Sequence, residues 1–310
     1  MDLLLSKTEH DFQSMLENYR ILSENMRDLI SIIDLKGRCE FVSASHARIL
    51  GIYPEELQGE YAGNWLHPHD ADIVARRLKR LIETNKECTF RFRYGNNRRE
   101  WKWLEAKASP IFAENGTLEK ILIVSSDITE RIRYEENLKH LAYHDPLTEL
   151  PNRRLFRERL RQSIKEAECY GHEMAVMYMD LDNFKQVNDS LGHAVGDKLL
   201  QQFAGRVEEC LCESDTLSRR GGDEFTVLFP EIQEKNDVKL IAERINEFLR
   251  KPWYIRGHIF TTTTSIGVAF YPQDGLTPHE LLENADSALY KVKARGKDNY
   301  SFYRYSDYDI

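Results

Sequence analysis

The beginning of the chain places apolar side chains at alternating steps of three and four. This spacing predicts an amphipathic helix over residues 1–27, because it aligns these side chains along one helical face. The stripe would either pair two protomers or pack on the helix's own domain, and it is short for a coiled coil. Its members are Phe12, Met15, Tyr19, Leu22, Met26 and Leu29.

Residues 28–128 change to short apolar or alternating runs. Aromatic residues alternate with arginines between residues 89 and 94, which is the period-two pattern of a strand. Glycine- and asparagine-containing turns separate the runs, and a helical segment with histidines lies in the middle. This order predicts an antiparallel sheet with helices on one face. Its strands are expected at residues 29–34, 39–42, 89–94, 101–108 and 120–125.

A charged helix is predicted over residues 129–144. Ile132, Leu138 and Leu141 lie between glutamates, arginines and lysines. This composition is typical of a signalling linker, and a plain solvated spacer helix would show the same pattern.

Strands and helices alternate through residues 145–310. Gly192 and Gly196 interrupt the helical pattern, so we expect a helix after residue 184 to break near Gly192 and resume at Asp197. The other expected elements are a strand at 174–179, a hairpin around Gly221-Gly222, a helix at 237–249, a Thr-rich strand at 259–270, a helix at 278–294 and a strand at 300–305.

Acidic residues follow two of these strands. Asp180 and Asp182 end the buried strand, and Asp223 and Glu224 follow two glycines at the hairpin tip. Adjacent glycines adopt positive φ and leave room for a phosphate or ribose to approach the backbone. Carboxylates from two strand ends can converge on Mg²⁺, which is usually held by one or two carboxylates and substrate phosphates. The arrangement indicates phosphoryl or nucleotidyl transfer.

The amino-acid composition limits which partners the protein can bind and indicates its cellular compartment. The 310 residues include 43 basic and 51 acidic side chains, and the net charge of -8 disfavours nonspecific attraction to nucleic acid or anionic membrane. The apolar run from Leu3 to Leu5 is too short for a signal peptide or membrane span. Five cysteines without zinc-ligand spacing are typical of reduced thiols, so we expect a cytoplasmic protein without membrane insertion.

Residues 28–128 resemble a PAS domain, a family of small sensor modules. The resemblance rests on the opening hairpin, on the segment from Trp65 to Asp70 and on the closing segment from Asp127 to Arg131. It implies that this domain senses a small molecule or cofactor, whose identity remains unknown. His67 and His69 are candidate haem ligands, although general grounds favour a helix-capping or surface role for each.

Residues 145–310 resemble a GGDEF domain of the diguanylate cyclase family. The resemblance implies an α+β or α/β fold with a central mixed sheet flanked by helices, related to nucleotide cyclases and polymerase palms. It also implies a homodimer that condenses two GTP molecules into cyclic di-GMP, using Mg²⁺ or Mn²⁺. The matching segments are 145–154, 180–189, Gly192-His193 with Gly196-Asp197, 219–225 and 285–297.

The resemblance also implies a role for each matching residue. Asp180, the Leu181 carbonyl, Asp223 and Glu224 would hold the metal, and Asp223 would be the catalytic base. Asn188 and Asp197 would bind guanine, because an Asp acceptor matches the N1–H of guanine and not adenine. Lys185 would be a further catalytic residue. The remaining residues that would bind GTP are Gly221, Gly222, Lys293 and Lys297.

Three positions depart from the family pattern. Cys212 stands where an arginine would begin the Arg-x-x-Asp inhibitory site that ends at Asp215, so little product inhibition is expected there. Lys297 replaces a more usual arginine, which keeps the charge but loses the bidentate fork. Glu149 stands where glycine is common.

Two other functions compete with the cyclase. One is a catalytically silent GGDEF domain that binds GTP or a protein partner, and intact Asp180, Asp223, Glu224 and Lys185 argue against it. The other is a haem or flavin sensor in which the PAS-like part is the functional core. The interpretation as a cyclic di-GMP receptor has less support still, because the arginine that such receptors use is absent from the inhibitory site.

Overall fold

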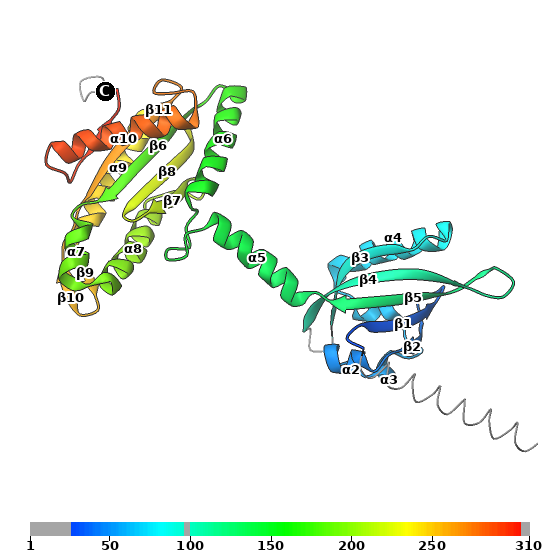
Figure 1. Ribbon diagram of the computed structural model, residues 1–310. Coiled ribbons are helices and arrows are strands. Elements are labelled where there is room, and N and C mark those ends of the chain that lie inside the picture. Colours follow the sequence, from blue (N-terminus) through cyan, green and yellow to red (C-terminus); the bar gives the residue numbers. More distant parts are fainter. Residues whose placement is uncertain (1–25, 96–99, 305–310) are drawn as a thin grey trace, which may run out of the picture. The chain divides into compact units, whose positions relative to one another are not determined.

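The computed structural model describes residues 26–95 and 100–304. The predicted helix over residues 1–27 lies almost entirely outside this part of the chain. The chain divides into two compact units, Met1–Glu136 and Asn137–Ile310, and helix α5 (Thr129–Tyr143) crosses the boundary between them (Figure 1). Each unit is described by itself.

The N-terminal unit is a five-stranded antiparallel sheet with the order β2-β1-β5-β4-β3. Leu29, Ile33, Phe92 and Leu104 point from one face of the sheet into a core shared with the helices. The strands are β1 (Leu29–Asp34), β2 (Cys39–Val42), β3 (Cys88–Gly95), β4 (Trp101–Phe112) and β5 (Leu118–Asp127). The helices are α2 (Ser45–Leu50), α3 (Pro54–Leu57), the 3₁₀ helix η1 (Ala62–Trp65) and α4 (Pro68–Thr84).

Helix α4 is fixed at its start by a cap and an ion pair. His67 is the N-cap, and its Nδ1 accepts a hydrogen bond from the His69 amide at 3.2 Å. This confirms the capping role predicted for His67. One turn later, the nearly buried Asp70 carboxylate accepts two hydrogen bonds from the Arg93 guanidinium and one from the Arg93 amide, each between 2.8 and 2.9 Å. These bonds join α4 to β3 and hold the pKa of Asp70 below its ordinary value.

The C-terminal unit has a mixed five-stranded sheet with the order β12-β11-β6-β8-β7, in which only β11 and β12 are parallel. Its strands are β6 (Glu173–Leu181), β7 (Thr216–Gly221), β8 (Glu224–Ile232), β11 (Thr264–Tyr271) and β12 (Tyr300–Phe302), and β9 (Trp253–Ile255) and β10 (His258–Phe260) form a separate hairpin. The helices are α6 (Arg153–Tyr170), α7 (Phe184–Leu191), α8 (His193–Glu208), α9 (Lys235–Leu249) and α10 (Pro278–Ala294).

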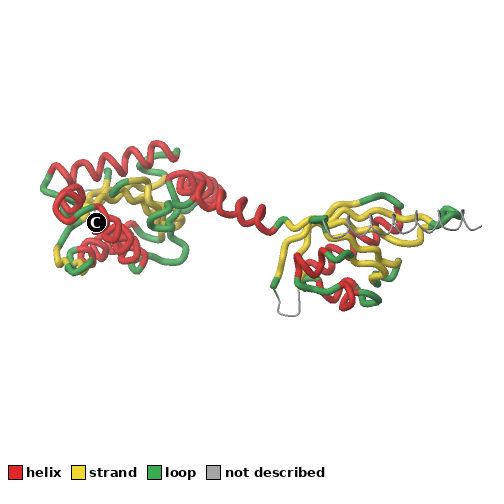
Figure 2. Tube along the Cα trace, turned by 60° about the horizontal axis from the view of Figure 1, so that its bottom comes forward, coloured by secondary structure: helices red, strands yellow, loops and turns green. Residues whose placement is uncertain are grey.

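Helices cover both faces of this sheet (Figure 2). One face packs Met177, Phe225 and Val268 against α8 and α9, whereas the other packs Val176 and Leu228 against α6 and α10. Since the central strands β6, β8 and β11 are buried on both faces, their sequences contain long, mostly apolar runs. The predicted fold class is confirmed for both units.

Two predicted elements were wrong in detail. The Thr-rich strand predicted at 259–270 is interrupted, because Thr262 and Thr263 leave the sheet and bond to Asp182. The helix expected to resume at Asp197 begins at His193 instead. Gly192, at φ 87°, makes the whole break, while Gly196 stays helical and its missing Cβ leaves space for the Asn188 side chain.

We predict opposite effects on stability from two Gly→Ala substitutions in the C-terminal unit. A Cβ at Gly267 on β11 would overlap the backbone of Ala285 and Leu289 on α10, so Gly267→Ala should lower the free energy of unfolding by about 1–3 kcal/mol. Gly205 on α8 has no neighbour within 4 Å of such a Cβ, so Gly205→Ala should raise it by about 0.5–1 kcal/mol. Urea unfolding measures both, and equal effects would contradict the close packing of α10.

Candidate active site

The register of two strands brings the acidic residues together. In the β6–β8 pair Asp180 lies directly opposite Glu224, so both side chains project from the same face of the sheet. The Tyr178 hydroxyl, on that face as well, donates a 2.8 Å hydrogen bond to Glu224 Oε2. Burial and this bond raise the pKa of Tyr178, so the phenol stays a donor. Asp180 and Glu224 are 44 positions apart in the sequence, and the pairing of β6 with β8 brings them together.

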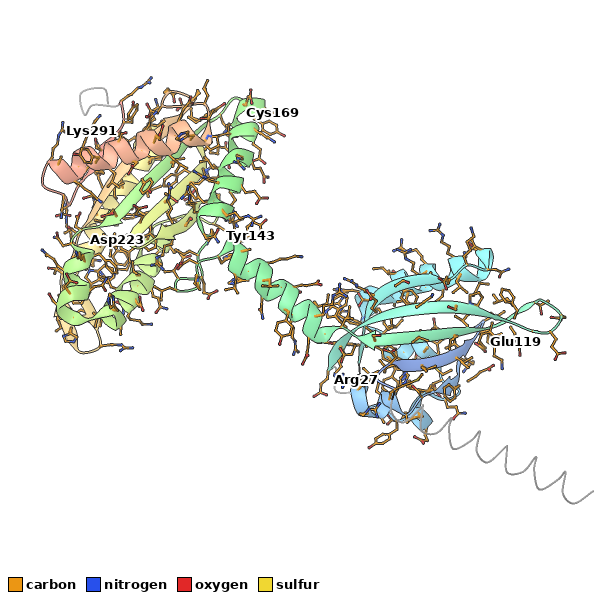
Figure 3. All side chains as sticks on the ribbon, viewed as in Figure 1. Arg27, Glu119, Tyr143, Cys169, Asp223 and Lys291 are labelled. Carbon is orange, nitrogen blue, oxygen red and sulfur yellow. The ribbon has the colours of Figure 1, made fainter. Side chains whose placement is uncertain are left out.

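The hairpin tip holds Asp223 beside the end of β6 (Figure 3). Gly221 and Gly222 adopt φ values of 146° and 56°, which side chains rarely tolerate and glycine adopts readily. The Leu181 amide donates to the Asp223 carbonyl at 3.4 Å. Asp223 therefore lies next to the strand end that carries Asp180.

An arginine that sequence reasoning left without a role braces this tip. Arg219 Nε and Nη2 donate to the Gly222 carbonyl at 3.0 and 2.8 Å, and Nη1 donates to Asp145 Oδ1 at 2.8 Å. Asp145 also accepts from the Thr148 amide and hydroxyl. Burial alone would raise the pKa of Asp145, but these bonds outweigh it and lower the pKa. Both residues belong to the segments that carry the family resemblance, which was the available signal.

The Asp180 carboxylate is the electrostatic centre of the site. Its side chain is 13% exposed, and Lys293 Nζ on α10 lies 2.8 Å from its Oδ2. Burial, together with the negative charges of Asp223 and Asp182, raises the pKa of Asp180 to about 6, although the hydrogen bond and the charge of Lys293 oppose this rise. The ionised form is therefore under-compensated and would gain from a further cation.

The described residues contain no cluster of three or more His, Cys, Asp or Glu side chains that could hold a metal ion. A Mg²⁺-type site here would take Asp180 and Asp223 from the protein and further oxygen ligands from a backbone carbonyl and a substrate. The donor set is compatible with that cation, because Mg²⁺ is commonly bound by one or two carboxylates plus phosphates.

Asp182 has a different, structural task. Its carboxylate is 2% exposed and accepts three hydrogen bonds, from the Thr263 hydroxyl at 2.6 Å, the Ser265 hydroxyl at 2.7 Å and the Asp298 amide at 3.1 Å. It ties β6 to β11 and to the loop after α10. Although Asp182 is two residues from Asp180, it is not a free ligand.

The same loop positions the second predicted lysine. Lys297 Nζ donates to Asn183 Oδ1 at 2.7 Å, in the turn that starts α7. Lys293 and Lys297 are thus both brought to the end of β6. In contrast, Lys185 is exposed, and no hydrogen bond or ion pair links it to another described residue.

The two predicted guanine-binding residues lie on facing helices. The Asn188 side chain on α7 occupies the space above Gly196 on α8, and Asp197 follows Gly196 directly. Asp197 is exposed and Asn188 half-buried. The α7–α8 break at Gly192 therefore brings these two side chains to one place, while their contact with guanine stays a prediction.

The other two departures from the family pattern, besides Lys297, also have a structural setting. Asp215 Oδ2 accepts from the Cys212 amide at 2.9 Å and thereby closes a turn. Glu149 has φ 61°, which explains why glycine is common there. Its carboxylate lies 3.3 Å from His140 Nε2 on α5, a contact that glycine would not make.

The fold and this arrangement of carboxylates and lysines are those of an α/β domain with a candidate nucleotide site, and a separate antiparallel-sheet domain precedes it in the sequence. The family model "Diguanylate cyclase, GGDEF domain" matches residues 142–299, about half of the chain, and a PAS fold model matches residues 23–133. The chain belongs to the GGDEF family and carries a PAS-fold domain before its GGDEF domain.

Curated relatives and a solved structure agree with this assignment. The bifunctional diguanylate cyclase/cyclic di-GMP phosphodiesterase MucR of Pseudomonas aeruginosa is 43% identical over 178 residues, which are 57% of this chain and 26% of MucR. Signaling protein YkoW of Bacillus subtilis is 29% identical over 98% of this chain and 38% of its own. The chain thus spans well under half the length of either relative.

The solved GGDEF domain of TpbB (YfiN) from Pseudomonas aeruginosa is similar to the C-terminal unit. It is 38% identical, has a TM-score of 0.51, and covers 52% of this chain and 94% of its own. None of the helices within residues 26–95 and 100–304 combines the length and hydropathy that a membrane-spanning segment requires.

We predict that Asp180→Asn stabilises the protein in a pH-dependent way. Because the folded-state pKa is raised from 3.8 to about 6, ionisation disfavours the folded state, and stability falls as pH rises between these values. The variant should therefore unfold with about 2–3 kcal/mol more free energy than wild type at about pH 8. The difference should shrink toward zero near pH 4.

The matched control is Asp182→Asn. An amide there leaves at least one buried donor without an acceptor, which should destabilise the protein by about 1–3 kcal/mol. Denaturant unfolding of the three proteins across this pH range measures both effects. A destabilised Asp180→Asn at pH 8 would show that Asp180 is a structural carboxylate like Asp182.

Proposed function

We propose that the protein is a cytoplasmic diguanylate cyclase that condenses two GTP molecules into cyclic di-GMP and two pyrophosphates. The observation that carries the proposal is the register that sets Asp180 opposite Glu224, with Asp223 at the adjoining tip and Lys293 beside Asp180. Membership of the GGDEF family supports the same activity.

Each side chain has a defined task in this proposal. Asp180, Asp223 and the Leu181 carbonyl, assisted by Glu224, would hold Mg²⁺ or Mn²⁺. When bound, such a cation supplies positive charge against the triphosphate and the departing pyrophosphate. Gly221 and Gly222 let the nucleotide approach the backbone of the tip.

The chemical step requires one proton acceptor and one displaced group. Asp223 would accept the proton of a ribose 3′-hydroxyl. The oxygen then forms a bond to the α-phosphorus of the other GTP, and the bond to the bridging oxygen breaks, releasing pyrophosphate. Lys185, Lys293 and Lys297 would neutralise phosphate oxygens. Asp197 would accept hydrogen bonds from the N1–H and exocyclic amine of guanine, which adenine cannot match in the same way, and Asn188 would hydrogen-bond the same base.

We predict that the full chain, incubated with GTP and Mg²⁺, yields cyclic di-GMP by mass analysis. Asp223→Asn should lower turnover at least about a hundredfold, because the amide can neither accept the proton nor carry the charge. Glu231→Gln, an exposed carboxylate change on strand β8, which begins directly after Asp223, should leave turnover unchanged. Absence of the product from the wild-type protein would favour the silent GTP-binding domain.

Two protomers are needed, because each GGDEF domain binds one GTP and the two 3′-hydroxyls attack reciprocally. Helix α5 supports a dimer. Its side chains Tyr134, Leu138 and Leu141 are 67%, 65% and 60% exposed, and their spacing of four and three places them on one face. We propose that the PAS domain acts through this helix, by setting how the two GGDEF domains face each other.

We predict that Leu138→Glu weakens this dimer. Losing one buried leucine from each protomer should raise the dissociation constant about tenfold or more, so specific activity should fall at low protein concentration and recover at high concentration. Lys139→Glu introduces a glutamate beside the stripe, with a larger change of net charge because a lysine is lost, and should still behave as wild type. Identical activity-against-concentration curves for Leu138→Glu and wild type would exclude α5 as the dimer contact.

We also propose weak product inhibition through the degenerate site at Cys212 and Asp215. No guanidinium is available at position 212, and the Asp215 carboxylate already closes a turn. Titrating cyclic di-GMP into the assay should lower turnover little, and Asp215→Ala should not change the titration curve. Strong noncompetitive inhibition that disappears in Asp215→Ala would contradict this.

A further inference from the structure

The N-terminal unit contains a partly open cavity of about 460 Å³ between its sheet and α4. We propose that this cavity binds an uncharged, largely apolar small molecule that donates a hydrogen bond to Ser31. The inference deepens the sensor role proposed above and depends on it only for the link to turnover. Apolar side chains make up most of the wall, among them Leu29, Ile33, Val74, Phe90, Phe92 and Leu104.

The charges around the cavity exclude an ionic ligand. Of the described residues that line it, the charged ones are Lys36, Lys79 and Glu83, and all three are exposed. Lys79 and Glu83 also lie 3.9 Å from each other. A charged group among the apolar side chains, away from these three exposed residues, would lose its hydration without gaining an opposite charge, which is costly. An uncharged ligand meets no such penalty.

The direction of one hydrogen bond follows from His46, which lines the cavity and is 4% exposed. Burial lowers the pKa of His46 to about 4, so the ring is neutral near pH 7. Its Nδ1 lies 3.2 Å from the Ser43 carbonyl oxygen, which can only accept, so Nδ1 carries the proton. Nε2 is then an acceptor, and the Ser31 hydroxyl at 3.1 Å must donate to it.

The Ser31 oxygen therefore offers only lone pairs to the cavity. A ligand placed against it has to supply an O–H or N–H group, because an acceptor there would face only lone pairs of the Ser31 oxygen and would stay without a hydrogen bond. Two further hydroxyls on the wall, of Ser125 and Tyr94, bond to no other described residue and can meet a second polar group. The polar part of the ligand is thus small, and the rest is apolar.

A series of hydrogen bonds, joined in places by the backbone itself, leads from the Ser43 and His46 end of the cavity to the start of α5. The Ser43 and Ser45 hydroxyls are 2.6 Å apart, and Ser45 donates to the Asp28 carbonyl at 2.8 Å. The Asp28 carboxylate accepts from the Ser126 hydroxyl at 2.6 Å, and the next residue, Asp127, accepts from the Thr129 amide that begins α5. A ligand that changes the Ser31–His46 bond acts at one end of this series of bonds.

Three probes with one biphenyl body test the proposal on the full chain without nucleotide. They are 4-phenylphenol, its methyl ether 4-methoxybiphenyl, and biphenyl-4-carboxylate. Calorimetric titration should show the phenol binding about tenfold more tightly than the ether, equivalent to about 1.4 kcal/mol, and no binding of the carboxylate. Ser31→Ala should bind phenol and ether equally. Ser109→Ala, the same change on β4 away from the cavity, should behave as wild type.

The binding of the three probes can be compared in the wild-type protein alone. The test therefore remains valid even if Ser31→Ala fails to fold. Equal binding of phenol and ether, preference for the carboxylate, or binding of none of the three overturns the proposal. Turnover of GTP is measured separately with and without the phenol. Binding without any effect on turnover would contradict the sensor role and leave the ligand class standing.

Discussion

A carboxylate removed from water at the end of a central strand is the constraint on which the catalytic unit depends. Asp180 is held in its ionised form against burial and against two neighbouring carboxylates, and Lys293 compensates this cost only in part. A site with this imbalance attracts cations and makes a triphosphate with its counter-ions a favourable occupant. The same imbalance costs stability, which is the usual relation between a functional site and the fold that carries it.

The rest of the unit can be understood as support for that strand end. Asp182, two residues later, satisfies its own charge with donors from β11 and from the loop after α10. Those bonds fix the loop that carries Lys297 and follows the helix of Lys293. On the other side, Arg219 ties the hairpin tip to the entry segment through Asp145. The structural carboxylate, Asp182, and the candidate catalytic carboxylate, Asp180, therefore lie two residues apart. The hydrogen-bond donors around Asp182 distinguish it from Asp180.

The sequence allowed some of these elements to be predicted because their signals are local. The helix over residues 278–294 was predicted at its observed bounds, and the structure shows local features that fix its start: Pro278 lies in the first turn and Thr277 with Glu280 forms a capping box. The hairpin tip was predicted from its two glycines. The family resemblance supplied the site residues, and the structure brings Asp180, Glu224, Asp223 and the lysines to one sheet end.

Other features depend on contacts that no spacing reveals. The predicted strand at 259–270 failed because the buried Asp182 draws Thr262 and Thr263 out of the sheet, and Asp182 is 80 residues before Thr262. The ion pair of Lys293 and the bracing by Arg219 likewise join elements that are distant in the sequence. The proton direction at Ser31 depends on the tautomer of His46, which only the position of the Ser43 carbonyl decides. Local patterns thus determine elements, whereas long-range hydrogen bonds determine which polar groups remain available for function.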